Sequence, residues 1–241
     1  LFMPVLDAEF TKLSVSGMLA TRISYINDLA VVAEKLGIDI EHVRQGMAAD
    51  SRIGASYLYP GAGFGGENFS HDILTLSNTV SDTGTKSQLL SPVWDINEQQ
   101  KEILFRKLWN YYHGDLNGKT VAIWGAAFKE NTARIQQSPI HAMLKALWAQ
   151  GVTVKLHDPQ ALAEIEKEYG HRKDLIYCTD QYEATKNAHA LCLLTAWKQY
   201  WSPNYSELLK TMNHPLILDG RNIYDPSYVK AQGFAYMGVG R

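Results

Sequence analysis

The chain lacks any long apolar run and any excess of charge of one sign. No stretch approaches the roughly 20 apolar residues that a bilayer crossing needs, and no signal-peptide pattern opens the sequence. The 23 basic and 25 acidic residues leave a formal net charge of −2. Because the basic residues are scattered, neither a nucleic-acid-binding nor a membrane-binding surface is indicated. We therefore expect no nucleic-acid partner and no membrane association.

Cysteine is equally scarce. Cys178 and Cys192 each lie within an apolar stretch, and their spacing does not match a metal site. Buried free thiols are typical of proteins in a reducing compartment, which predicts a cytoplasmic protein without a bound metal. An apolar fraction of 46% with 20% charged residues is ordinary for a globular protein, and 241 residues suffice for one large or two modest domains.

The first part of the chain has the periodicity of helices. Between Pro4 and Gly37 the apolar residues recur at steps of three and four, which predicts one long helix with a buried stripe. Gly37 is placed to end this helix. Asp39 is placed to cap a short helix that extends to about Met47.

The stretch SRIGASYLYPGAGFGGENFSHD interrupts this pattern and holds five of the chain's 18 glycines. Beyond it we expect two more helices, which begin at polar capping residues. The first begins at Ser70 or Asp72. The second begins at Ser87 or Ser91 and runs to about Gly114.

After these helices the sequence changes character. Apolar runs of strand length, TVAIWGAAF first and FAYMGVG last, alternate with helical patterns. Such alternation predicts a parallel sheet wrapped by helices, as in Rossmann-like domains. The helices are expected at 138–150, 161–169, around Glu183 and at 203–212. The predicted fold is therefore an all-helical domain at 1–113 followed by a Rossmann-like α/β domain at 114–241.

Gly61, Gly63 and Gly66 have the spacing G-x-G-x-x-G. A dinucleotide fingerprint needs a strand before it and a helix after it, whereas a helical segment and the run YLYP precede these glycines, so the match is false. Two interpretations stay open. The loop is either merely irregular, or its backbone N–H groups approach an anionic or sugar ligand as closely as only glycine permits.

Two cations are expected at the carboxyl edge of the predicted sheet. The first strand-to-helix turn has Gly125 but no further glycine, so it cannot form the pyrophosphate cradle of a dinucleotide site. Lys129 lies at that turn, and Arg221 ends another strand in the run DGRN. Because carboxyl ends of parallel strands share one edge, both side chains converge on one crevice. This convergence favours an anion site over two solvated side chains.

Several stretches, taken together and in this order, resemble the UDP-glucose/GDP-mannose dehydrogenases, the nucleotide-sugar 6-dehydrogenases. They are AEFTK…LATRISYIND, DSRIG…YPGAGFGG…F.HD, GKTVAIWGAAFK..T, DGRNIYDP and GFAYMGVGR, and they cover nearly the whole chain. The resemblance implies an NAD-binding domain, then a helical dimerisation domain, then a Rossmann-like domain that holds the nucleotide. Because residue 1 lies at the start of the central helix, the first of these domains is expected to be absent from this chain.

The same resemblance implies a function. Members of this family oxidise the C6 alcohol of a nucleotide sugar to a carboxylate. They do so in two hydride transfers to NAD, through a thioester on cysteine. The implied partners are a UDP-sugar or GDP-sugar and a second copy of the chain in a homodimer. The implied setting is cytoplasmic polysaccharide biosynthesis.

When the catalytic residues of the family are carried over position by position, this chain matches them only in part. Lys12 matches the lysine that stabilises developing oxyanion charge, and Asp72 matches the aspartate that orients water. Ser16 stands where the family has asparagine, and Asn68 stands where the family has its catalytic cysteine. An amide is no substitute for a thiolate nucleophile, so no covalent acyl intermediate is expected at this position.

This chain matches the family's substrate-binding residues more fully than its catalytic residues. Arg52 matches an arginine that reaches the substrate of the neighbouring subunit, and Tyr57 matches an aromatic residue of the nucleotide pocket. The other implied contacts are Gly65, Gly66, Phe128, Lys129 and Arg221. Gln136 replaces the arginine that faces the NAD pyrophosphate in the motif TDDxR, which reads TARIQ here. This change removes a charge-assisted contact of roughly 1.5–3 kcal/mol.

Three functional hypotheses follow. The chain is a nucleotide-sugar-binding dimer that cannot complete the oxidation, or an altered enzyme that needs an upstream domain and stops at the aldehyde or uses another sugar, or a structural protein. The converging cations favour the first two hypotheses over a structural role, because random sequence change would soon remove cations that no ligand requires. We expect that this chain alone does not oxidise a nucleotide sugar to its acid.

Overall fold

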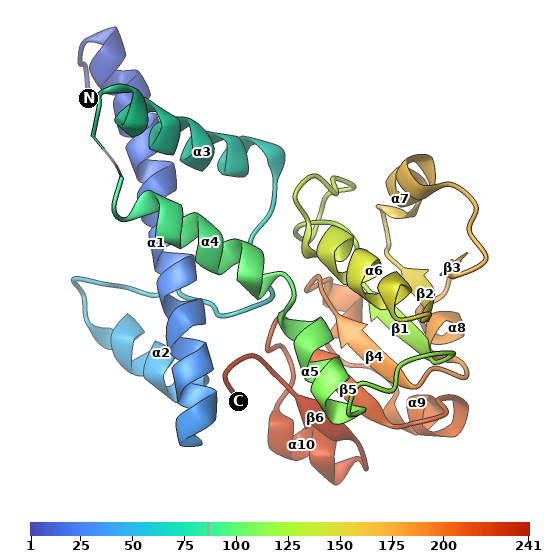
Figure 1. The fold of residues 1–241 in the computed structure, drawn as a ribbon. Coiled ribbons are helices and arrows are strands. Elements are labelled where there is room, and N and C mark those ends of the chain that lie inside the picture. The colour runs from blue at the N-terminus through green and yellow to red at the C-terminus, as the bar shows by residue number, and fades with distance from the viewer. Residues whose placement is uncertain (86) are drawn as a thin grey trace.

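The computed structural model describes residues 1–85 and 87–241, which form a helical part and a parallel sheet with its covering helices (Figure 1). Within these residues, no helix combines the length and apolar character that crossing a membrane requires. The same residues contain no group of three or more side chains suited to hold a metal ion.

The helix α1 (Val5–Leu36) is the spine of the helical part (Figure 1). Its buried stripe consists largely of small residues, among them Gly17, Ala20 and Ala30, and this lets α3 and α4 pack closely against it. The helix ends where Gly37 adopts a left-handed φ of 69°. The predicted long helix and its glycine end are confirmed.

The next helix, α2 (Ile40–Ala49), begins as predicted, because the Asp39 carboxylate accepts a hydrogen bond from the backbone N–H of Glu41. Helix α3 (Glu67–Asp82) begins earlier than expected. The prediction of a start at Ser70 or Asp72 is wrong because Gly66, at a φ of 96°, already turns the chain into the helix.

The long helix predicted up to Gly114 is in fact two helices, α4 (Leu90–Gln100) and α5 (Ile103–Tyr111). Helix α4 begins between the two predicted starts, Ser87 and Ser91, and the Ser87 hydroxyl accepts a hydrogen bond from Leu90 N–H. The break has a packing reason. Because of it, α4 lies on α1 while α5 turns away and packs against α6 and β5.

The second part is a sheet of six parallel strands in the order β3-β2-β1-β4-β5-β6. The strands are β1 (Thr120–Trp124), β2 (Thr153–His157), β3 (Leu175–Tyr177), β4 (Ala190–Leu193), β5 (Leu216–Asp219) and β6 (Ala235–Met237). This is the doubly wound order, in which ligands bind beyond the carboxyl ends of the strands where the order reverses. The predicted Rossmann-like architecture is confirmed.

Four helices of this part occupy the segments in which they were predicted: α6 (Pro139–Ala149), α7 (Leu162–Tyr169), α8 (Gln181–Thr185) and α9 (Tyr205–Thr211). Two short elements were not predicted, the 3-10 helix η1 (Lys198–Tyr200) and α10 (Pro226–Ala231). The start of α10 did carry a local signal, because Asp225 caps it and Pro226 occupies its first turn.

The main core lies between the sheet and its helices, where the Trp124 and Tyr200 rings stack with centroids 4.9 Å apart. The chain end joins the two parts. The carbonyl of Gly240 accepts a hydrogen bond from Ile40 N–H at 3.0 Å, and a Cβ at Gly240 would lie 2.8 Å from the Cβ of Ala30. The carboxyl-terminal tail is therefore packed tightly against the helical part (Figure 1).

Candidate functional site

A cavity of about 430 Å³ lies at the carboxyl edge of the sheet, where the helical part meets it. Its walls come from α1, from the loop before α3, from the start of α3, and from the segments that follow β1 and β5. The residues predicted from the sequence that line it are Tyr57, Gly65, Gly66, Asn68, Phe128, Lys129 and Arg221.

We call residues 61–66 the glycine loop, and its residues 63–66 form one wall of this cavity. On the helical side, the amide oxygen of Asn27 accepts a hydrogen bond from Gly61 N–H at 2.9 Å. The Gln100 side chain donates to the Gly61 carbonyl at 2.8 Å. The glycine loop therefore takes its position partly from α1 and α4.

The sheet part holds the same loop from the opposite side. Ala62 N–H donates to the carbonyl of Gly220, which follows β5, at 2.8 Å. Gly66 N–H donates to the carbonyl of Gln136, in the segment before α6, at 2.9 Å. The cavity geometry thus depends on how the two parts are placed relative to one another.

Two glycines of the loop are required by close contact. A Cβ at Gly65 would lie 2.5 Å from the Gln137 carbonyl oxygen, and a Cβ at Gly66, where φ is 96°, would lie 2.9 Å from the Phe128 ring. No side chain fits at either position without displacement of the neighbouring segment. Packing alone therefore accounts for these glycines, and the loop they form also faces the cavity.

Arg221 is the best-defined charged group of the cavity. Its Nε donates to the Leu194 carbonyl at 2.5 Å and its Nη1 to the Gly63 carbonyl at 3.3 Å. Its Nη2 is buried and has no hydrogen-bond partner among the described residues. Burial lowers the pKa of the guanidinium, an effect that Glu130 and Asp219 partly offset, and a guanidinium stays protonated at neutral pH.

Two further cations line the same space. Lys129 follows β1 and its ammonium lies 5.7 Å from the centroid of the Phe128 ring, while Arg134 lies further along the same segment. Against these cations and Arg221, the lining contains one carboxylate, that of Glu67. The predicted convergence of Lys129 and Arg221 on one crevice agrees with the structure, and the excess of positive charge suits an anionic ligand.

Asn68 lies in the first turn of α3, and its side chain is exposed to the cavity. Gly66 and Glu67, at the start of this helix, also line the cavity, so the partly positive N-terminal end of α3 faces the same space. An amide there can donate and accept hydrogen bonds, but it supplies no nucleophile.

Lys12, Ser16 and Asp72 lie together, although α1 and α3 are far apart in sequence. The Asp72 carboxylate forms an ion pair with Lys12 and accepts a hydrogen bond from the Ser16 hydroxyl at 2.8 Å. Burial raises the pKa of Asp72, but the hydrogen bonds from Lys12 and Ser16 outweigh it and hold this pKa below its ordinary value. The three side chains do not line the cavity itself.

Two predicted site residues lie elsewhere. Arg52 is exposed and pairs with Asp50 at 2.6 Å, outside the cavity, and its expected role in a neighbouring subunit stays a prediction. Gln136 borders a second hollow of about 400 Å³ between α4 and α6, together with Lys101 and Gln137.

The cavity also includes residues that the sequence analysis did not assign to a site. They are Ile23, Tyr59, Glu67, Phe69 and Arg134. Tyr59 and Phe69 flank the glycine loop, so their proximity to it was available from the sequence. Arg134 had no such signal, because it reaches the cavity through a hydrogen bond from Phe128 N–H to its carbonyl at 3.0 Å, which closes the loop between them.

The turn after β1 does not fit the pyrophosphate of NAD. The N–H groups of Ala126 and Ala127 both donate to the Asp158 carboxylate, at 2.7 and 3.0 Å, and Gly125 N–H donates to the His157 carbonyl at 2.8 Å. These are the groups that would cradle a pyrophosphate in a dinucleotide site. They are satisfied within the protein, so this turn is not a cofactor site.

A doubly wound parallel sheet with a cationic cavity at its carboxyl edge, bordered by a loop from a helical part, places this chain in the Rossmann-like class of folds. Residues 6–99 match the central domain of the UDP-glucose/GDP-mannose dehydrogenase family, and residues 122–226 match the UDP binding domain of that family. The chain belongs to the UDP-glucose/GDP-mannose dehydrogenase family.

Individual relatives agree with this assignment. The chain is 40% identical over 238 residues to a UDP-glucose 6-dehydrogenase of Pseudomonas aeruginosa, and the match covers 98% of this chain and 52% of the relative. It is 34% identical to a UDP-glucose 6-dehydrogenase of Rickettsia conorii, over 98% of this chain and 54% of the relative. The chain thus spans about half the length of the curated relatives it matches.

Solved structures show the same partial coverage. A UDP-glucose dehydrogenase from Pyrobaculum islandicum superimposes with a TM-score of 0.86 at 28% identity, over 97% of this chain and 51% of that one. A UDP-D-ManNAc dehydrogenase from Pyrococcus horikoshii superimposes with a TM-score of 0.81 at 22% identity, which bears on the fold alone.

Proposed function

We propose that this chain binds a nucleotide diphosphate sugar, UDP-linked or GDP-linked, in the cavity at the sheet edge. The observation that carries the proposal is the buried Nη2 of Arg221, which has no hydrogen-bond partner among the described residues. A buried donor left unpaired is costly, and an anionic oxygen satisfies it with a charge-assisted hydrogen bond. Lys129 supplies a second charge for the same diphosphate.

The remaining wall suits the two ends of such a ligand. Gly65 and Gly66 line the cavity, and we propose that the sugar lies along their backbone. Tyr57 and Phe128 offer aromatic faces for a base. The relatives with the matching domains are UDP-glucose 6-dehydrogenases, so UDP-glucose is the first ligand to test.

We further propose that this chain by itself does not complete the oxidation that its family name implies. Asn68 offers no thiolate for a covalent acyl intermediate. The turn at Gly125 has its N–H groups engaged and does not hold NAD. Binding without acid formation is therefore the expected behaviour of these 241 residues.

A second candidate is an altered enzyme that oxidises the alcohol only as far as the aldehyde, or uses another sugar, when an NAD domain is present. The cluster of Lys12, Ser16 and Asp72 favours it, because a cation and a carboxylate are held together there by direct contacts. Such a pair can stabilise an oxyanion and orient a water molecule without a nucleophilic cysteine.

We also propose a homodimer built on α1. Met18, Tyr25 and Val32 recur at steps of seven residues on this helix and are exposed by 63, 52 and 49%. Val15, exposed by 52%, extends the same stripe. An exposed apolar stripe opposite a buried one is typical of a helix that packs against a second copy. Sedimentation at micromolar concentration should show a dimer, and only a monomer near 27.1 kDa would contradict it.

Titration calorimetry with UDP-glucose, UDP and GDP-mannose tests the binding proposal. We expect heat with at least one of them, and an affinity about 10-fold lower or more in Lys129→Ala, since a charge-assisted contact is lost. Lys210→Ala, an exposed lysine on α9 outside the cavity, is the matched control and should bind as the parent does. No heat with any ligand up to millimolar concentration would leave only the structural role.

A further inference from the structure

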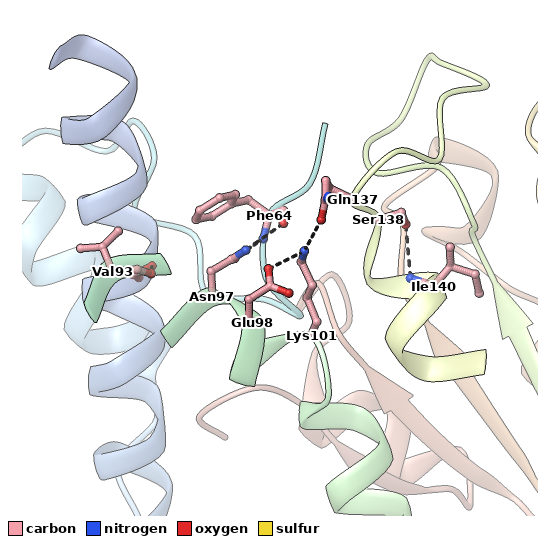
Figure 2. A network of polar contacts seen from close by, with 9 residues as sticks. Phe64, Val93, Asn97, Glu98, Lys101, Gln137, Ser138 and Ile140 are labelled. Atoms are coloured by element: carbon pink, nitrogen blue, oxygen red, sulfur yellow. Dashed lines mark hydrogen bonds and ion pairs between the residues drawn. The ribbon is translucent and has the colours of Figure 1, made fainter. Parts of the chain in front are cut away.

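Lys101 is a buried cation at the break between α4 and α5. Its side chain is 5% exposed, and its ammonium lies 2.7 Å from a carboxylate oxygen of Glu98 (Figure 2). It also donates to the Gln137 side-chain oxygen at 3.3 Å and lies 5.5 Å from the centroid of the Trp94 ring. A buried ammonium needs such partners to offset its desolvation. One of these partners, Gln137, belongs to the sheet part.

Gln137 is held in an unusual conformation. Its φ of 57° lies in the left-handed region, which is unfavourable for a residue with a side chain. It directly precedes Ser138, which caps α6, so Gln137 forms the turn into that helix (Figure 2). The contact with Lys101 therefore ties a strained turn of the sheet part to α4 of the helical part.

The same turn supports the end of the glycine loop. The Gln137 carbonyl oxygen lies 2.5 Å from where a Cβ of Gly65 would be, and the Gln136 carbonyl accepts the Gly66 N–H at 2.9 Å. A shift of residues 136–137 would therefore move Gly65 and Gly66, which line the cavity.

Asn97, one helical turn before Lys101, holds the other side of the loop. Its amide accepts from Phe64 N–H at 2.8 Å and donates to the Phe64 carbonyl at 3.2 Å (Figure 2). A Cβ at Gly63 would lie 3.2 Å from the Cγ of Lys101. Asn97 on α4 thus contacts the glycine loop directly. Lys101, one turn later on the same face, contacts Gln137, the residue of the sheet part that supports the loop.

We propose that Lys101 is a positioning residue for the cavity. By holding Gln137, it fixes the separation between the Gly65–Gly66 backbone and the Phe128 ring, and so the shape of the wall where the sugar part of the ligand lies. The assignment of that wall to a sugar rests on the proposed function, whereas the positioning of the loop does not.

Hydrogen exchange tests the positioning without any ligand. In Lys101→Met, which keeps most of the unbranched side chain but removes its charge, the amides of residues 64–66 should exchange about 10-fold faster, with α1 and the sheet unchanged. Lys101→Arg should restore slow exchange. Unchanged exchange at residues 64–66, or faster exchange spread over the whole chain, would overturn the proposal. If Lys101→Met does not fold, Gln137→Met removes the same contact from an exposed side chain and should give the same local change.

Ligand affinity separates positioning of the sugar wall from general destabilisation. In Lys101→Met and in Gln137→Met, the ratio of UDP-glucose affinity to UDP affinity should fall about 10-fold, and the double variant should fall no further because the two residues act through one contact. Equal losses for UDP and UDP-glucose would show that Lys101 has no role at the sugar wall. If the parent chain binds neither ligand, the proposed function fails, and hydrogen exchange alone decides the positioning.

Discussion

The cavity has a sheet wall, formed by the segments after β1 and β5, and a helical wall, formed by α1, the glycine loop and the start of α3. The two walls differ in which residues of the family pattern they retain. The sheet wall has Phe128, Lys129 and Arg221, the residues that the resemblance assigns to the nucleotide. The helical wall has Asn68 where the resemblance assigns the nucleophile. The residues proposed to hold the nucleotide and the position that the resemblance assigns to the nucleophile therefore lie on different elements, and a change in one need not disturb the other.

The difference between the walls has a structural cause. The guanidinium of Arg221 is buried and fixed by carbonyl groups of Leu194 and Gly63, so its replacement would leave a gap and unpaired acceptors. Asn68 lies exposed in the first turn of α3, where a substitution disturbs little packing. Position 68 on the helical wall thus tolerates change more readily than position 221 on the sheet wall.

The largest effect is expected where the two walls touch. Gly66→Ala adds a Cβ 2.9 Å from the Phe128 ring at a φ of 96°. The unfavourable backbone conformation should cost about 1–3 kcal/mol and the overpacking about 1–3 kcal/mol of unfolding free energy. Denaturant titration measures the total loss of unfolding free energy.

Gly118→Ala is the matched control for this substitution. Gly118 has a φ of 71° and nothing within 4 Å of its added Cβ, so the change should show the cost of a side chain at positive φ without a close contact. Equal losses in Gly66→Ala and Gly118→Ala would show that the contact between the walls is loose.

The next effect concerns the sheet wall alone. Arg221→Met should weaken UDP binding by about 1.5–3 kcal/mol, because a charge-assisted contact to the diphosphate is removed. Arg106→Met is the control, since that guanidinium is exposed and donates to the Gln99 carbonyl outside the cavity. Calorimetry in which both variants bind UDP equally would exclude a diphosphate at Arg221.

A smaller effect is expected on the helical wall. Asn68→Ala should weaken UDP-glucose binding by about 0.5–1.5 kcal/mol, the range for a neutral hydrogen bond, and should leave UDP binding unchanged. The same titrations measure both. A larger loss for Asn68→Ala than for Arg221→Met would reverse the comparison between the walls and make the helical one the main source of affinity.

The smallest effect is expected at Asp72, beside the cavity. Because hydrogen bonds from Lys12 and Ser16 hold the pKa of Asp72 below its ordinary value of 3.8, the stabilisation is complete above that pH and is lost as the pH falls through the folded-state pKa. Lys12 is 63% exposed, so the pair should contribute only about 0–1 kcal/mol.

Thermal melts of Asp72→Asn as a function of pH check this effect. The variant should melt slightly below the parent at pH 7, and the difference should vanish at strongly acidic pH. Asp95→Asn, an exposed aspartate on α4, is the control and should match the parent throughout. A difference in melting temperature that grows on acidification would mean that folding raises the pKa of Asp72 instead of lowering it.

Much of the fold was predictable from the sequence because its signals are local. The period of α1, the glycine at its end and the alternation from Thr120 onward each depend on neighbouring residues. The errors fall where distant contacts decide. At the break, Lys101 donates to Gln137 in the other part, and α3 starts after Gly66, whose backbone lies too close to the Phe128 ring for a side chain.

The candidate site was predictable to a similar extent. Lys129 and Arg221 follow strands whose carboxyl ends must share an edge, so their convergence needed no long-range information. Arg134 reaches the cavity only through the return of its own loop, and Ile23 only through the packing of α1. The boundary at residue 113, the cytoplasmic setting and the role of Arg52 stay predictions.

The measurement that tests the account most directly joins a family NAD domain to this chain and compares the fusion with its Asn68→Cys variant. Both should bind UDP alike, since the sheet wall is the same in each. The variant should form acid with two NADH per sugar at least about a thousandfold faster than the fusion with Asn68, because the loss of a nucleophile removes the covalent route. Acid formation by the Asn68 fusion at the rate of the cysteine variant would contradict the account and make Asn68 and Asp72 a different kind of catalytic site.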